Sequence, residues 1–314
     1  MAVFSCTRIW SGHFWLLFIS QLGIAIGQPF VVNGISKLVL EWFPKEQTAI
    51  ATGLGTMGMF IGMALGMALT PALVEQFGFQ KTMEIFAAIS IFTCMMFLLF
   101  AKKNPTHANL DSQEVTIQES FLPLLQNRSL LKVFILAFLG LGFFNGLTTW
   151  IEPILAQSGI NSEQAGMVGG VLILGGIVGA VVIPGLSDHF KRRKPFLVGS
   201  IWIALLTLYP LCTLRTYSGV LCLAIIQGFF FLPAFALLLE VASELAGERL
   251  AGSATGILML FGNAGGVLVI LAMEWVKGDG PSFFPAVLLV LAILTIAAGL
   301  AGILPETHQR RKVQ

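Results

Sequence analysis

The sequence QPFVVNGISKLVLE at residues 28–41 decides the fold, because it returns 199 positions later as QGFFFLPAFALLLE at residues 227–240. After a four-residue insertion, ATGL at residues 51–54 returns as ATGI at residues 254–257. Both copies combine an apolar helix that carries Gln and Phe, a short charged connection and a second apolar helix rich in glycine. Two apolar helices can resemble each other by chance, but here polar Gln and Glu keep the same register as Phe. The repeat therefore predicts two related halves.

The composition places these halves in a membrane. The chain has 56% hydrophobic and 11% charged residues, and its mean hydropathy is +0.87, whereas a soluble domain carries about a quarter charged residues. Long apolar stretches alternate with short polar connections, which is the pattern of an all-α membrane protein. The lipid bilayer is the expected surrounding. The net charge of +2 implies no nucleic-acid partner.

Nine apolar stretches are long enough to cross a bilayer, which takes about 20 residues for each helix. They divide the chain into a transmembrane region at 1–101, a polar cytoplasmic linker at 102–130 and a six-helix transmembrane region at 131–314. The predicted spans are 13–39, 47–73, 79–101, 131–152, 162–184, 195–214, 218–241, 250–276 and 282–304.

The repeat also predicts that the first half is truncated. Three apolar spans precede the repeated segment in the second half, and their first-half equivalents would lie before Met1. About seventy residues, at ~20 for each of three spans, therefore have no counterpart here. We expect the last three spans of the first half, followed by all six of the second, with residues 1–5 as the tail of a further span.

The distribution of Lys and Arg predicts the orientation. If residues 102–130 are cytoplasmic, fourteen of the 18 Lys and Arg residues lie inside, in agreement with the positive-inside rule. This orientation predicts a multi-pass plasma-membrane protein with a cytoplasmic C-terminus. The four residues left outside are Arg8, Lys81, Arg215 and Lys277.

Motifs for catalysis or metal binding are absent from the sequence. The four cysteines lie in or beside spans without metal-ligand spacing, and the four histidines are scattered. There is no phosphate-binding Gly-rich loop, nucleophile elbow or zinc motif. The sequence therefore predicts no enzyme, no cofactor and no metal site, and it lacks the nucleotide domain of an ATP-driven pump.

The connection after the second span of the second half carries a family resemblance. It reads PGLSDHFKRRKP at residues 184–195. It resembles the cytoplasmic signature of the major facilitator superfamily, in which Gly, then Asp, then a Gly-Arg-basic run link the second and third helices of each half. Pro184 stands where the first Gly is usual, and Lys191 where the second is. The resemblance implies the major facilitator fold, with a substrate site between two halves that rock to alternate access.

A narrower resemblance concerns the first copy of the repeat. Residues 27–30, GQPF, and 42–44, WFP, resemble transporters related to the feline leukaemia virus subgroup C receptor, which carry choline, ethanolamine or haem-related cargo. Bacterial permeases share similar segments, including residues 144–146 and 150–153. The receptor-related group has Gln at the positions that align with Met57 and Asn263, so the resemblance does not define the cargo.

Polar side chains within the spans are the candidates for substrate binding, because each is costly in lipid. Asn145, Thr149 and Glu152 follow i, i+4, i+7 spacing and predict one polar stripe on a helix. Glu152 is also the candidate for proton or cation coupling. The alternatives are interhelical hydrogen bonds and, for Glu152, a solvated helix end. The full set of predicted substrate contacts is Gln28, Asn33, Asn145, Thr149, Glu152, Gln227 and Asn263.

Charged residues at the cytoplasmic helix ends are predicted to form a gate. In the superfamily that the signature resembles, the Asp pairs with basic groups when the cytoplasmic side is closed, and opening breaks those pairs. A simple positive-inside anchor is the alternative. The predicted gating residues are Asp188, Arg192, Arg193, Glu41 and Glu240, the last two being repeat mates.

These patterns and the resemblance together predict a secondary active transporter of a small organic solute that works by alternating access. Coupling to protons or another cation is left open. The alternative of another class is a non-transporting membrane fragment, or a half-assembly that needs a partner chain. A membrane-embedded enzyme would need clustered catalytic groups, which the sequence lacks.

Overall fold

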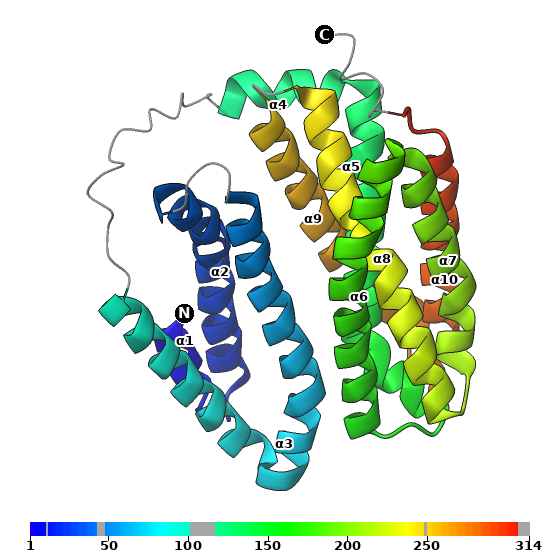
Figure 1. Cartoon of the computed structure of the whole chain (residues 1–314). Helices are drawn as coiled ribbons and strands as arrows, with labels where there is room; N and C mark the ends of the chain where they lie inside the picture. The colour runs from blue at the N-terminus through cyan, green and yellow to red at the C-terminus, as the bar shows by residue number, and fades with distance from the viewer. Residues whose placement is uncertain (11, 43–47, 101–116, 248–249, 307–314) are drawn as a thin grey trace. The chain divides into compact units, whose positions relative to one another are not determined.

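The computed structural model of the chain describes residues 1–10, 12–42, 48–100, 117–247 and 250–306, and every regular element among them is a helix (Figure 1). The chain divides into two compact units, Met1–Gln113 and Glu114–Gln314. Some side chains in the first four helices lie outside the description, including those of Asn33 and Glu41. Each unit is considered by itself.

The first unit contains α1 (Ala2–Thr7), α2 (Phe14–Trp42) and α3 (Thr48–Phe100). α3 is broken at Gly78, whose φ of 79° and ψ of 163° are not helical. Glycine takes a positive φ without steric cost, so two straight segments can meet at this residue. The two segments correspond to the predicted spans 47–73 and 79–101, although the first continues past its predicted end to the break at Gly78.

The short α1 packs against the longer helices of its unit. The Phe4 ring lies where a side chain on Gly23 of α2 would be. The hydroxyl oxygens of Thr7 and Ser20 are 2.6 Å apart, and helix α3 joins α1 through a hydroxyl–hydroxyl hydrogen bond of 3.1 Å. These contacts place residues 1–5 on the unit, and their role as the tail of a further span stays a prediction.

Seven helices in the described part of the chain are long and apolar enough to cross a membrane. α3 is counted once among them although it covers two predicted spans, and α2 contributes the shorter apolar stretch Phe14–Gln28. The prediction of an all-helical membrane fold is confirmed. The count of nine spans and the domain ranges 1–101, 102–130 and 131–314 stay predictions.

The second unit holds seven helices within the residues that the structure describes. The first of them lies inside the range predicted as linker and packs on α5 and α9. The helices are α4 (Ile117–Gln126), α5 (Arg128–Ala156), α6 (Ser162–Phe190), α7 (Lys194–Thr213), α8 (Tyr217–Ala246), α9 (Ala251–Lys277) and α10 (Phe284–Gly302).

Two pairs of helices in this unit approach closely at glycines. Between α6 and α8, a Cβ on Gly179 would overlap the carbonyl oxygen of Phe229, and a Cβ on Gly228 would overlap the backbone of α6. Between α5 and α9, a Cβ on Gly265 would overlap the carbonyl oxygen of Phe138. Small residues let transmembrane backbones pack this closely, and van der Waals contact then holds the helices together.

The two close pairs are equivalent to each other. The helices α5, α6 and α7 can be matched in order to α8, α9 and α10. Under this matching the α5–α9 pair corresponds to the α8–α6 pair. The unit is therefore built from two three-helix repeats, the arrangement found within the six-helix halves of many secondary transporters.

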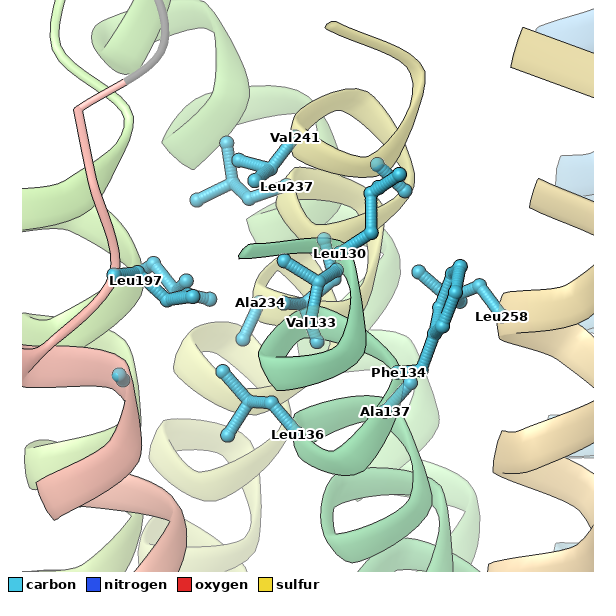
Figure 2. Packing of buried hydrophobic residues seen from close by; sticks show 14 of the residues in the cluster. Leu130, Val133, Phe134, Leu136, Ala137, Leu197, Ala234, Leu237, Val241 and Leu258 are labelled. Carbon is cyan, nitrogen blue, oxygen red and sulfur yellow. The ribbon is translucent and has the colours of Figure 1, made fainter. Parts of the chain in front are cut away.

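Buried apolar side chains fix the ends of several of these helices. Figure 2 shows Leu130 and Phe134 of α5 in one cluster with Leu197 of α7 and Leu237 of α8. Close packing of this kind leaves little freedom for the backbone of the helices that contribute to it. The cluster therefore holds in place the part of α8 that carries Glu240.

Candidate functional site

The connection between α6 and α7 is a tight reversal. α6 ends at Phe190, and Lys191 takes the left-handed conformation with φ 54° and ψ 40°. The Lys191 N–H donates to the Asp188 carbonyl oxygen, and the Arg192 N–H donates to that of Ser187, each at 3.1 Å. A left-handed residue after a helix is usually glycine, because a Cβ is strained there. Glycine, which stands here in the signature that residues 184–195 resemble, would take this conformation without strain.

The reversal brings Arg193 into contact with three carboxylates. Its Nη1 lies 2.6 Å from Asp188 Oδ1 and 2.7 Å from Glu240 Oε2, and its Nη2 lies 3.4 Å from Glu244 Oε1. The Arg193 side chain is only 8% exposed. A buried guanidinium needs compensating charge, and its fork of donors can serve several acceptors. One cation therefore joins the end of α6, the start of α7 and the last turns of α8.

A fourth carboxylate binds the backbone at the same place. Glu306 follows α10, and its two carboxylate oxygens accept the N–H groups of Arg193 at 2.8 Å and of Lys194 at 3.2 Å. These N–H groups begin α7 and have no partner within the helix. A negative charge at a helix N-terminus is also favourable to the helix dipole. Glu306 thus ties the segment after α10 to the start of α7.

The structure brings three of the predicted gating residues together, namely Asp188, Arg193 and Glu240. Arg192 is exposed, and its side chain forms no ion pair within the described ranges. Glu41 cannot be placed, since its side chain lies outside the described residues.

Sequence reasoning missed two members of the site. Glu244 lies four residues after Glu240 and so shares its helix face, which is a signal that could have found it. Glu306 lies beyond the end of α10, and no pattern in the sequence marks it as a partner of Arg193.

The predicted polar stripe runs along α5, but its members differ in their surroundings. Asn145 is half-buried, and its Nδ2 lies where a side chain on Gly266 of α9 would be. Thr149 and Glu152 are exposed. The Glu152 carboxylate accepts a hydrogen bond from the Ser162 hydroxyl at the start of α6. Asn145 therefore packs α5 against α9, while the Glu152 end of the stripe is accessible.

Gln227 is buried where α7 meets α8. Its Oε1 accepts a hydrogen bond from the Thr207 hydroxyl. Its Nε2 has no hydrogen-bond partner among the residues described. This arrangement matches the interhelical hydrogen bond that the sequence left open as an alternative, and a substrate contact by Gln227 stays a prediction.

The remaining predicted contacts are exposed or outside the description. Asn263 is exposed, and its Nδ2 donates to the Met259 carbonyl oxygen of its own helix at 2.9 Å. Gln28 is exposed on α2 of the first unit, and the Asn33 side chain is not described. Within the described part of the chain, no group of three or more His, Cys, Asp or Glu side chains could hold a metal ion.

Long apolar helices, two three-helix repeats and a charged cluster at one end of the bundle define a helical multi-pass membrane protein of transporter type. Residues 1–270 match the family model of the Major Facilitator Superfamily, and the chain belongs to this superfamily. The prediction of a major facilitator-type fold is thereby confirmed.

Known proteins resemble the chain over half of its length or more. A protein of Archaeoglobus fulgidus is 35% identical over 162 residues, which are 52% of this chain and 74% of that protein. Solute carrier family 49 member A3 of Xenopus tropicalis is 25% identical over 271 residues. The match covers 83% of this chain but 56% of the frog protein, so the chain spans about half of that relative. This similarity is loosely consistent with the narrower resemblance to the receptor-related transporters.

A solved structure has the same fold. A bacterial homologue of the human lysosomal transporter Spinster, inward-facing and unoccupied, superposes with a TM-score of 0.73. The superposition covers 96% of this chain and 80% of that one at 14% identity, so it shows the fold alone. The expected truncation of the first half stays a prediction.

Replacing Lys191 with glycine is expected to stabilise the protein. The left-handed conformation costs an L-residue about 1–2 kcal/mol, and glycine avoids most of that cost. Lys191→Gly should therefore raise the melting temperature in detergent micelles. Lys191→Ala is the matched control, because it removes the same charge but keeps the strained Cβ, and it should melt like the parent protein. Equal melting of all three proteins would contradict the assignment of strain.

Proposed function

We propose that the protein is a secondary active transporter that moves a small organic solute across the plasma membrane by alternating access. The observation that carries the proposal is the match of residues 1–270 to the Major Facilitator Superfamily model. The C-terminus lies in the cytoplasm in this proposal, because that orientation puts most Lys and Arg residues inside. Protease access to a C-terminal tag in sealed right-side-out vesicles checks the orientation, and cleavage from outside would contradict it.

The gate in this proposal is the Arg193 cluster, defined as Arg193, Asp188, Glu240 and Glu244. Arg193 is buried, but Asp188 is 57% exposed and Glu240 is 38% exposed. Water can solvate these two acids once their ion pairs open, but the buried guanidinium must then become exposed or keep another carboxylate beside it. The cluster can thus favour one state of the transport cycle without locking the protein in it.

The substrate contacts in this proposal centre on the α5 stripe of Asn145, Thr149 and Glu152. In this proposal Glu152 couples transport to a proton or another cation. Its carboxylate is exposed, and its described partner is the neutral Ser162 hydroxyl. The carboxylate forms no ion pair within the described part of the chain, so in this proposal it is available to a proton or to a cationic group. The other proposed contacts are Gln28, Asn33, Gln227 and Asn263.

Glu152→Gln should impair transport more than Asn145→Ala. The first change removes a charge whose hydrogen bonds contribute about 1.5–3 kcal/mol, and the second removes neutral ones of about 0.5–1.5 kcal/mol. The measurement is uptake in proteoliposomes at several pH values, with a solute found by a thermal-shift screen. Glu163→Gln, an exposed acid at the start of α6, is the matched control and should transport normally. Normal, pH-dependent uptake by Glu152→Gln would make Glu152 a solvated helix end. Absence of uptake by the parent protein would favour the fragment alternative.

Asp188→Asn should shift the balance between inward-open and outward-open states while leaving the solute affinity of each state unchanged. The change weakens one contact of the Arg193 cluster and touches no proposed substrate contact. Electron–electron distance measurements with one spin label in each compact unit would report the populations. Asp279→Asn, an exposed acid at the opposite end of the bundle, should leave them unchanged. Identical distance distributions for the parent protein and Asp188→Asn would exclude gating by this contact.

A further inference from the structure

A pocket opens in the second unit at the end opposite the Arg193 cluster. α7 has 20 residues, which corresponds to ~30 Å of helix, and it runs from the cluster to this pocket. The pocket lies among the ends of α5 and α7 and the start of α10, and its volume is about 180 Å³. A water molecule occupies about 30 Å³ of liquid, so the pocket has room for a small organic group.

The polar side of the pocket is positively charged. Gln157, Ser158, Thr213 and Arg215 line it, and no carboxylate is among the lining residues. Arg215 is exposed and forms no ion pair within the ranges that the structure describes. Its guanidinium presents five N–H donors in a fork that suits carboxylate or phosphate oxygens.

Two neighbouring side chains are held in place. The Gln157 Nε2 donates to the Pro281 carbonyl oxygen at 2.8 Å. The Thr213 hydroxyl donates to the Tyr209 carbonyl oxygen at 2.9 Å. The mouth of the pocket is thus built from ordered groups on two helix ends, and Arg215 projects from the short connection that follows α7.

The other side of the pocket is apolar. Ile154 and Val287 are 2% and 4% exposed, and Phe284 of α10 completes the wall. An inorganic ion would contact none of this surface favourably. The pocket therefore suits a ligand with an anionic group at one end and a short apolar chain at the other.

We propose that this pocket binds a small amphipathic organic anion, a carboxylate or phosphate joined to a short hydrocarbon group, whose charge pairs with Arg215. The ligand chemistry is shared by soluble organic anions and by the head-group region of an anionic lipid. No residue of the α5 stripe or of the Arg193 cluster lines the site, and the proposal does not depend on the proposed transport. The competing explanation is that Arg215 only stabilises the free carbonyl groups at the C-terminus of α7.

The test uses the full chain and two sources of the anion. In a neutral detergent, melting temperature is followed against butyl phosphate at constant ionic strength, with chloride as the balancing ion. In lipid nanodiscs, melting in phosphatidylglycerol is compared with melting in phosphatidylcholine. A saturable rise with butyl phosphate assigns the site to soluble anions, and a rise confined to phosphatidylglycerol assigns it to lipid. No rise in either arm overturns the proposal.

Three variants separate the pocket from general charge effects. Arg215→Ala should raise the half-saturating concentration about tenfold or more, as expected for loss of a charge-assisted hydrogen bond. Thr213→Phe keeps Arg215 but fills the pocket, and it should abolish the rise. Lys81→Ala removes an exposed cation from the first unit and should respond like the parent protein. Unchanged responses in Arg215→Ala or in Thr213→Phe would overturn the proposal, and the second outcome would leave Arg215 as a helix-end cation.

Discussion

The second unit depends on one buried guanidinium. Removing a partner from a buried ion pair leaves an uncompensated charge that costs several kcal/mol. Arg193 can therefore stay 8% exposed only while carboxylates from α6 and α8 remain beside it. Glu306 binds the backbone N–H of the same residue, so the segment after α10 is held at that point as well. Lys191 adopts the strained left-handed conformation that reverses the chain after α6. This reversal places Arg193 where the four parts of the chain meet.

Two kinds of contact hold the helices of the second unit together, and water can replace only one of them. The glycine contacts between α6 and α8, and between α5 and α9, bring backbones together, and no water can take their place. The ion pairs of Arg193 involve partly exposed acids, which water can solvate. These ion pairs all lie within the second unit, so they break only when α6, α7 and α8 shift relative to one another, and the glycine contacts between α6 and α8 resist such a shift.

The sequence predicted the features that have a periodic or compositional cause. Long apolar stretches predicted the helices, and i, i+4, i+7 spacing predicted the α5 stripe. The repeat predicted that Gln28 and Gln227 would be similar, yet Gln28 is exposed whereas Gln227 is 1% exposed. The sequence of an apolar helix shows at which level along the membrane normal a residue lies. Because the helix is apolar on all sides, the sequence does not show which side packs against another helix. The Thr207 contact of Gln227 could not be predicted for that reason.

Contacts between distant segments were the hardest to predict. Glu306 reaches α7 across more than a hundred positions of the chain, and the pocket near Arg215 combines three helix ends. No local pattern in a single sequence reports such pairings. The resemblance of residues 184–195 to the superfamily signature did single out Asp188 and Arg193, which form an ion pair in the structure, while their role in gating stays a prediction.

The central claim, that Arg193 joins α6, α7 and α8 electrostatically, is tested most directly by a double-mutant cycle. The free energy of unfolding in mixed micelles would be measured for Arg193→Gln, Glu240→Gln and the double variant. The two single changes should not add, and the coupling should be about 1 kcal/mol or more, within the range seen for residues in contact. Pairing Arg193→Gln with Glu274→Gln, an exposed acid near the far end of α9, should give additive effects. Additivity in both cycles would contradict the account, because Arg193 and Glu240 would then stabilise the bundle independently.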